Sequence, residues 1–400
     1  MRISSIEQFQ QGIDSILDQQ ARLNRTQQQL ATGKNILSPS DDPAAATQLL
    51  SLSSLAAKNT QYDRNVTVAK NELDLQESVL ASSGKVLQRV RELVIQANNA
   101  TQSNQSRASI GDELDNLADE LLQLSNTRNA SGEYIFSGYN SRTPAFTRTG
   151  AGFEFQGDQG QRLIQVSEDG QTIVRDNGQD VFEGMTTGDG RFLLETPDTN
   201  IGNGLVKLTS TSDSTEDNYT ITFSQASPDD PVLYSVTGAE SGAVVTGTYQ
   251  TGTSLTFNGI TIAIEGSVAN GDSFQINRSL KQSVFQTVQN LADALNTSVD
   301  TAAQSSKLAN DLGQALGTVD QAMEHLQSRR TIIGNRLQGL DTRIEENADE
   351  RLRLERQASE IQDLDFAQAV SDLNLQSVAL QAAQQAYVKI QGLSLFNYLR

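Results

Sequence analysis

The sequence contains few residues that could perform catalysis or hold a metal ion. His325 is the only histidine, and the chain has no cysteine. A Ser–His–Asp triad or a histidine-based metal site would therefore have to use His325. This residue stands next to Leu326 in a stretch dense with charged residues, which favours a solvated position on a helix. The HExxH pattern of zinc proteases is also absent.

Glycine-rich and acidic segments offer no better candidates. Residues 201–206 (IGNGLV) and 246–254 (TGTYQTGTS) lack the following helix and the Lys-Ser/Thr pair of a phosphate-binding loop, so they predict β-turns. Carboxylates are plentiful between residues 139 and 281 but are scattered along loops, which is typical of a solvated acidic surface. We therefore predict no enzyme activity, no catalytic residue, no cofactor and no metal.

Composition restricts the partners and the shape that can be expected. The net charge of −19 argues against binding to nucleic acid, which attracts basic chains. No segment is long and apolar enough to insert into a membrane, and the first residues lack the pattern of a cleaved secretory signal. With 36% hydrophobic and 5% aromatic residues, the chain is too poor in apolar groups for one large core. We expect an elongated protein of two or three domains.

One helical segment, residues 87–96 (LQRVRELVIQ), could contact a partner protein. Arg89 and Glu92 fall on the outer face of this predicted helix. Local ion pairing accounts for such a pattern and contributes only roughly 0.2–0.5 kcal/mol per pair. The alternative is a contact between neighbouring subunits, which would involve Arg89, Arg91 and Glu92.

The elements that would position such a surface are helices with a seven-residue repeat. Near the C-terminal end, one apolar row has members seven apart: Phe366, Leu373, Leu380 and Tyr387. A companion row, three residues on, contains Ala369, Ala383 and Ile390 and is interrupted by Gln376. A heptad seam of this kind requires a partner helix. Other apolar residues, such as Leu375 and Val378, lie outside the seam, so this helix should be buried on more than one side.

The N-terminal end carries a matching pattern. Its first row is Phe9, Ile16, Leu23 and Leu30, and its second row is Ile6 and Ile13 continued by Gln20 and Gln27. Alone, each terminal helix would be marginally stable in water. Two interpretations remain open: the two ends form a coil that other copies of the chain complete, or they pack on the chain's own body.

Two longer heptad patterns lie inside the terminal ones, over residues 44–100 and 312–361, and a shorter antiparallel helix follows the first. Gly33 is the predicted end of the first helix, and Ser40-Asp41-Asp42-Pro43 predicts the start of the next. The heptad phase slips at residues 363–365, which predicts a hinge before the C-terminal helix.

Residues 139–281 have a different character, rich in Gly, Thr, Ser and Asp, with short alternating apolar runs. Asn258-Gly259 separates two such runs and predicts a hairpin. Residues 188–190 (GDG) predict a loop tip. This segment is therefore expected to be an all-β insert of one or two small domains.

Together these patterns predict an α+β multidomain protein in which both termini form nested, antiparallel helical coils around an all-β insert. The predicted domains are a terminal coiled coil from residues 1–38 and 366–400, a helical rod from 39–138 and 282–365, and the β insert from 139–281.

Several motifs of the chain resemble those of bacterial flagellin and its relatives. They include residues 38–46 (SPSDDPAAA), 87–103 (LQRVRELVIQANNATQS) and 361–368 (IQDLDFAQ), while EYIFSGYNSRTPAFT and FQGDQGQR in the insert also look family-like. The resemblance covers roughly residues 1–140 and 283–400. Both ends, MRISSIEQFQQGIDSI and QQAYVKIQGLSLFNYLR, resemble the family members that join hook to filament more than filament flagellin.

The resemblance implies a structural subunit of the flagellum that acts as an adaptor at the hook–filament junction. It implies export through the flagellar apparatus without a cleaved signal, and an extracellular location. The implied partners are a ring of copies of this chain, the first hook-associated protein, flagellin and an export chaperone. By the same resemblance, the terminal helices order on assembly and form an inner tube, and the segment around Arg89 contributes to subunit stacking.

Two other functions are weighed against the junction protein. Filament flagellin fits the shared body but not the two ends. A surface-displayed binding module or enzyme carrying the β insert would require an activity that is lost when the insert is deleted.

Overall fold

The computed structural model describes residues 5–99, 101–150, 152–211 and 217–398, with only the backbone described for 5, 6, 8, 9 and 390–398. The chain divides into two compact units, which are considered separately: residues 1–64 with 343–400, and residues 65–342. The helices are α1 (Ser5–Thr32), α2 (Pro43–Ala97), α3 (Asn104–Ser125), α4 (Gly178–Phe182), α5 (Val284–Asn296), α6 (Ala302–Gln362) and α7 (Phe366–Tyr398).

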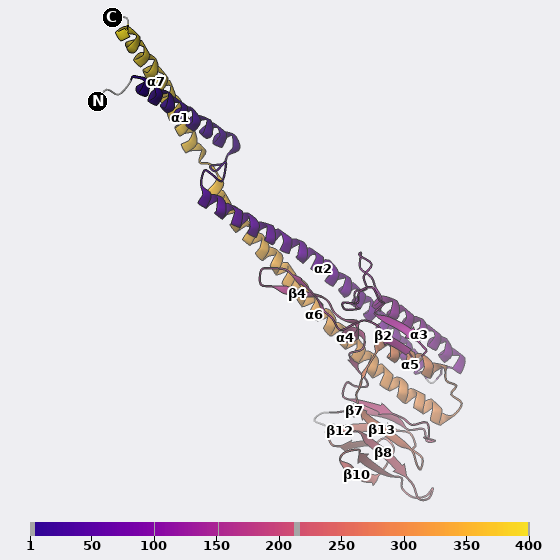
Figure 1. The fold of residues 1–400 in the computed structure, drawn as a ribbon. Coiled ribbons are helices and arrows are strands. Elements are labelled where there is room, and N and C mark those ends of the chain that lie inside the picture. The colour runs from indigo at the N-terminus through magenta and orange to yellow at the C-terminus, as the bar shows by residue number, and fades with distance from the viewer. Residues whose placement is uncertain (1–4, 100, 151, 212–216, 399–400) are drawn as a thin grey trace. The chain divides into compact units, whose positions relative to one another are not determined.

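The predicted fold class is confirmed. Helices from opposite ends of the chain lie side by side, α1 with α7 and α2 with α6, and the strands come from the middle of the sequence (Figure 1). Ion pairs link the inner helices, for example Lys70 to Asp341 at 2.6 Å and Arg351 to Asp63 at 2.9 Å. The exact boundaries of the three predicted domains stay a prediction.

Capping residues set the helix breaks in the first unit. Gly33 ends α1 with a φ of +68°, a backbone conformation that glycine adopts without strain. The carboxylates of Asp42 and Asp365 each accept two hydrogen bonds from backbone N–H groups in the first turns of α2 and α7. The predicted helix start at Pro43 is therefore confirmed, and the helix also breaks at residues 363–365, where the heptad phase slips. The hinge predicted there stays a prediction.

The two breaks are also joined to each other. The N–H of Asn35 donates to the carbonyl of Gln362 at 2.8 Å, and the N–H of Leu364 donates to the carbonyl of Gly33 at 3.0 Å. Backbone N–H and C=O groups that a continuous helix would pair internally are thus paired between the two helix breaks.

In the second unit, α2, α3, α5 and α6 surround one hydrophobic core. The predicted heptad row of α2 points into it, because Leu73, Leu80 and Leu87 are completely buried. Val319 and Ile333 of the predicted α6 row are also completely buried. The seven-residue spacing therefore identified the inward face of both long helices correctly.

Short hairpins cover this helical core. They pair β1 (Phe146–Thr149) with β2 (Gly152–Phe155), β3 (Arg162–Gln165) with β4 (Gln171–Arg175), and β5 (Met185–Thr186) with β14 (Lys281–Gln282). Four phenylalanines from different elements contact one another beneath them: Phe136, Phe146, Phe182 and Phe285.

The rest of the insert has a separate core between two antiparallel sheets. The five-stranded sheet has the order β10-β9-β8-β13-β6 and the three-stranded sheet the order β11-β12-β7. Their strands are β6 (Phe192–Glu195), β7 (Leu205–Ser210), β8 (Tyr219–Ser224), β9 (Leu233–Gly238), β10 (Gly242–Thr248), β11 (Ser254–Phe257), β12 (Ile260–Glu265) and β13 (Ser273–Arg278). The predicted Asn258-Gly259 hairpin is confirmed, with both residues at positive φ.

Candidate assembly interface

Helices α1 and α7 pack along the predicted heptad rows. Ile16, Leu23 and Leu30 of α1 and Leu373, Leu380 and Tyr387 of α7 are all half-buried. Where Gln376 interrupts the apolar row, its side-chain oxygen accepts a hydrogen bond of 3.0 Å from the hydroxyl of Thr26. Thr26 is itself buried, so the polar interruption is satisfied across the seam and fixes its register.

The described members of the second predicted row of α1 are exposed. Ile13 is 43% exposed, and Gln20 and Gln27 are exposed. The packed row lies one residue earlier: Thr26 is buried, and Gly12 lies so close to the ring of Tyr387 that a Cβ at Gly12 would be 3.2 Å from Cδ2. The side chains of Ile6, Phe9 and Ile390 lie outside the described residues.

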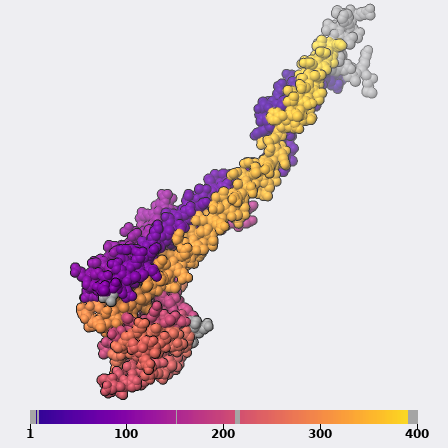
Figure 2. Space-filling model, turned by 180° about the vertical axis from the view of Figure 1, so that it is seen from behind, coloured from indigo at the N-terminus to yellow at the C-terminus, as the bar shows by residue number. Residues whose placement is uncertain are grey.

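Helix α7 leaves apolar side chains uncovered on both sides of its contact with α1. Phe366 is 56% exposed at its start, and Leu375 and Val378 are 66% and 64% exposed further along. Val370 and Val388 are exposed as well. On the face shown in Figure 2, α7 (yellow) lies open to the viewer, with α1 (indigo) beside it. A helix with apolar groups on several faces is normally covered on several faces.

The first unit has very little core of its own. Among the described residues, its buried hydrophobic side chains are Leu52, Leu354 and Ala369. Three polar residues, Thr26, Asn59 and Asn347, are buried in the same unit. Apolar side chains on this unit are therefore more often exposed than buried, which is the reverse of a domain that is stable by itself.

The segment around Arg89 is occupied by ion pairs between helices of the second unit. Arg89 of α2 binds Glu113 of α3 at 2.7 Å and Glu92 at 3.3 Å, and Arg91 binds Asp320 of α6 at 2.8 Å. All of these side chains are more than 40% exposed, so each pair contributes little to stability. The local ion pairing considered from the sequence is present, and a subunit contact stays a prediction.

Sequence reasoning missed a row of polar side chains on α6 that holds the insert. The row has members three or four residues apart, so they share one helix face. Asn310 accepts from the N–H of Val206 at 2.9 Å and donates to the carbonyl of Gly204 at 3.1 Å. Gln314 accepts from the N–H of Leu194 at 3.3 Å. We call this row the α6 ladder; its members are Asn310, Gln314, Thr318, Gln321 and His325.

The remaining members of the α6 ladder correct two predictions. His325 is not a solvated residue: it is half-buried, and its Nε2 lies 2.8 Å from the carbonyl oxygen of Asp180 in α4. Burial lowers the pKa of His325. The predicted loop tip at 188–190 is also packed, since the N–H of Gly188 donates to the hydroxyl of Thr318 at 2.9 Å.

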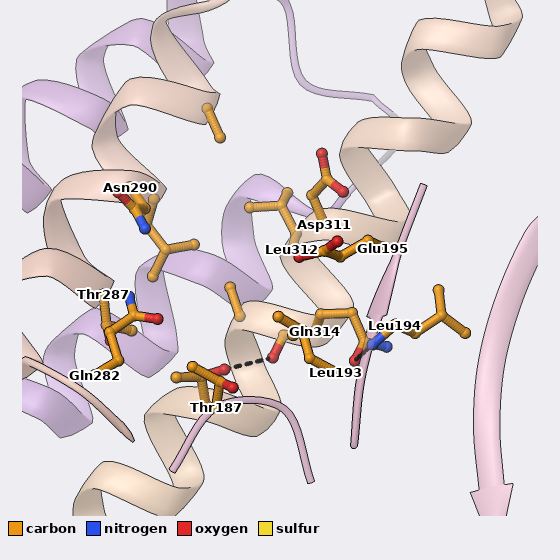
Figure 3. A pocket seen from close by; sticks show the side chains of 14 residues that line it. Thr187, Leu193, Leu194, Glu195, Gln282, Thr287, Asn290, Asp311, Leu312 and Gln314 are labelled. Atoms are coloured by element: carbon orange, nitrogen blue, oxygen red, sulfur yellow. Dashed lines mark hydrogen bonds between the residues drawn. The ribbon is translucent and has the colours of Figure 1, made fainter. Parts of the chain in front are cut away.

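Beside the α6 ladder lies a cavity of about 280 Å³ between α5, α6 and β6. Figure 3 shows Thr187, Glu195 and Asp311 around it, with Gln314 bonded to Leu194 at its edge. Its polar lining consists of amides, hydroxyls and the carboxylates of Glu195 and Asp311. Among the described residues, no cluster of His, Cys, Asp and Glu could hold a metal ion.

A buried ion cluster fastens β4 to the helices. Arg175, whose side chain is 2% exposed, binds Glu72 of α2 at 2.9 Å and Glu133 at 2.6 Å. The hydrogen bond from Arg175 lowers the pKa of Glu133. The next residue, Asp176, is also 2% exposed and binds Arg336 of α6 at 2.9 Å. These pairs join β4 and the residue after it to α2 and α6.

The architecture of two long terminal helical regions around a β insert can be compared with known proteins. Family models for the bacterial flagellin N-terminal and C-terminal helical regions match residues 4–141 and 316–399, respectively. The chain belongs to the bacterial flagellin family. It is thus a structural component of the flagellum that contacts other axial proteins. Within the described residues, no helix is long and apolar enough to cross a membrane.

Relatives of the chain include flagellar hook-associated proteins and filament flagellins. The flagellar hook-associated protein 3 of Escherichia coli K12 is 25% identical over 99% of both chains. The FlgL structure from Xanthomonas campestris is 30% identical, with a TM-score of 0.67, covering 76% of this chain and 99% of that one. The hook-associated protein 3 structure from Legionella pneumophila is 28% identical, with a TM-score of 0.74, covering 78% and 98%.

Proposed function

We propose that this chain is the structural adaptor at the junction between the flagellar hook and the filament. The similarity to hook-associated protein 3 of Escherichia coli extends over 99% of both chains, and a solved relative is described as the flagellar junction protein of Legionella pneumophila. The partners proposed for it are copies of itself in a ring, the first hook-associated protein and flagellin. Export through the flagellar apparatus, assisted by a chaperone, would bring the chain to this extracellular position.

Assembly with other subunits is supported by the many exposed and few buried apolar side chains of the first unit. Its helices expose Leu375 and Val378 while burying few apolar side chains within the chain. Burying one such side chain contributes roughly 1.5–3 kcal/mol. Ordering a residue's backbone costs about 1–2 kcal/mol. The uncovered faces of α7 can therefore be stabilised by neighbouring copies, which ties the order of α1 and α7 to assembly.

The subunit contacts proposed from the sequence belong to this assembly. The seam residues are Ile6, Phe9, Ile13, Ile16, Leu23, Leu30, Phe366, Leu373, Leu380, Tyr387 and Ile390. Some of them pack α1 on α7, whereas others, such as Ile13 and Phe366, are exposed and free to meet a neighbour. Arg89, Arg91 and Glu92 are proposed as a second, polar contact, because their intrachain ion pairs lie at the surface and can be exchanged at low cost.

The test uses a strain that lacks this protein. Its flagella therefore end at the hook. Purified chain is added to the hook tips, flagellin follows, and filaments are counted by electron microscopy. We expect filaments only when the chain is added first, and no long filaments from the chain alone. Growth of filaments from the chain alone would identify it as a flagellin instead. Ile201→Asp, on an exposed insert loop, serves as the surface control and should behave as wild type.

A further inference from the structure

An apolar groove runs along the first unit between α2 and α6. Its volume is about 470 Å³, and its lining includes Ala46, Leu49, Leu50 and Ala56 of α2 with Leu354 and Ala358 of α6. Leu50 at its edge is 73% exposed. No residue of Pro43–Ala57 carries a charge, although the chain as a whole has a net charge of −19. The one charged residue of the lining is Glu355.

A stripe on α7 has the form that such a groove accepts. Leu375, Val378, Ala382 and Ala386 are spaced three and four residues apart, so they form one face of the helix. All four are exposed, because the contact with α1 uses a different face. No charged residue occurs from Leu373 to Val388. A helix bound in a groove is typically held by apolar residues at this spacing.

Electrostatics select these two surfaces for contact between copies. Two chains of net charge −19 repel one another wherever charged surfaces approach. The groove side of α2 and the stripe of α7 are both charge-free, so they can meet without that cost. Within one chain, the helix breaks at residues 33–42 and 363–365 separate the groove from the stripe.

We propose that the α7 stripe of one copy docks in the α2–α6 groove of the next copy. This inference rests on the proposed assembly function and names the contact that would build the ring. Because the stripe and the groove are different surfaces, the contact is heterologous, which is the kind that generates rings or helical arrays. It predicts Leu50 of one copy within a few ångströms of Val378 of its neighbour.

The absence of native cysteine allows a direct test. In the variant Leu50→Cys/Val378→Cys, the two new thiols can be joined only if their Cα atoms come within about 7 Å. The variant is assembled on hook tips, oxidised mildly and run on a non-reducing gel. We expect a ladder of dimers and higher oligomers that reduction converts to monomer. The control, Ile95→Cys/Val378→Cys, places a thiol at an exposed α2 position of the second unit and should remain monomeric.

The outcomes separate this contact from the proposed function. Filament growth on the variant's hook tips without a ladder would overturn the groove contact and leave the junction function intact. Wild-type chain that fails to support filament growth would overturn the function. If the cysteine variant does not assemble, the contact is tested with charged variants instead. Leu50→Lys and Val378→Glu should each reduce the number of filaments about tenfold or more. The double variant Leu50→Lys/Val378→Glu should restore the number of filaments. Two singles without effect, or no recovery in the double variant, would contradict the contact.

Discussion

At the scale of single residues, Asp217 shows how one carboxylate holds a turn of the insert. It accepts hydrogen bonds from the Ser241 hydroxyl at 2.7 Å and from the N–H groups of Asn218, Glu240 and Ser241. These hydrogen bonds lower the pKa of Asp217 from its ordinary 3.8 to about 2, and the bond from the Ser241 hydroxyl has the largest effect. The carboxylate therefore holds the β9–β10 turn more strongly when it is ionised than when it is protonated.

Substitution of this carboxylate should change how the stability of the insert depends on pH. Because the folded pKa lies below the unfolded one, the stabilisation is fully present above about pH 4 and is lost as pH falls toward 2. We expect Asp217→Asn to lower the melting temperature at pH 7, with a difference from wild type that shrinks between pH 4 and pH 2. Calorimetric scans at several pH values measure this. A difference that is constant across that range would contradict the role of the charge.

Asn310 of the α6 ladder should be more important for stability than its neutral side chain suggests. It is 4% exposed and satisfies both the N–H of Val206 and the carbonyl of Gly204. Asn310→Ala leaves these buried groups unpaired, which should destabilise the second unit by about 1–3 kcal/mol. Urea unfolding measures the loss. Glu324→Ala, on the exposed side of the same helix, is the control and should change stability by less than about 0.5 kcal/mol.

At the scale of elements, the sequence predicted the inward faces of the long helices but not every contact row. Apolar residues seven apart are a direct record of burial, so the α2 and α6 rows through Leu80 and Leu326 were found. In α1 the packed row passes through Gly12 rather than Ile13. Glycine carries no apolar signal, and its fit to Tyr387 is visible only once the two helices are placed together.

The α6 ladder could not be predicted for a related reason. Its residues are an ordinary mixture of Asn, Gln, Thr and His, and their partners are backbone groups of segments 180–206, more than 100 residues away in sequence. Backbone groups look the same at every position of a sequence, so no pattern identifies them. The same holds for the cluster around Arg175, since charged residues are common on solvated faces and only the fold shows which become buried.

The α7 seam should be essential for assembly but not for folding of the second unit. Leu380→Asp or Tyr387→Asp places a charge at a half-buried position of the α1–α7 contact, which is costly for the packed helices. Leu380 and Tyr387 belong to the first unit, apart from the core of the second. We therefore expect a melting transition within about 2 °C of wild type and no filaments grown on hook tips.

Controls for these variants use the same helix. Gln384→Asp introduces a charge at an exposed polar position of α7 and should leave some junction formation. A normal junction made by Leu380→Asp or Tyr387→Asp would show that the seam is dispensable. A large fall in melting temperature would show that the second unit depends on the terminal helices for its own stability.

At the scale of the whole molecule, the two units differ in where their apolar side chains lie. The second unit buries two large clusters, one among its helices and one within the β sandwich. The first unit buries Leu52, Leu354 and Ala369 and leaves larger residues exposed, such as Leu50 and Phe366. Conformational entropy acts on every residue of both units. The second unit offsets it internally, whereas the first unit buries too few apolar side chains to do so, so we expect it to depend on contacts from outside the chain.

This difference predicts the order of events when the chain assembles. In unassembled protein, amide hydrogens of α1 and α7 should exchange readily, because opening these helices exposes little additional apolar surface. In the assembled junction the same amides should be strongly protected, while protection in the core of the second unit stays nearly unchanged. Hydrogen exchange with mass spectrometry compares the two states, and Val378→Glu, which should remain unassembled, controls for solution conditions. Equal protection of α1 and α7 in both states would mean that the terminal helices are already stable in the single chain, and that assembly joins preformed surfaces.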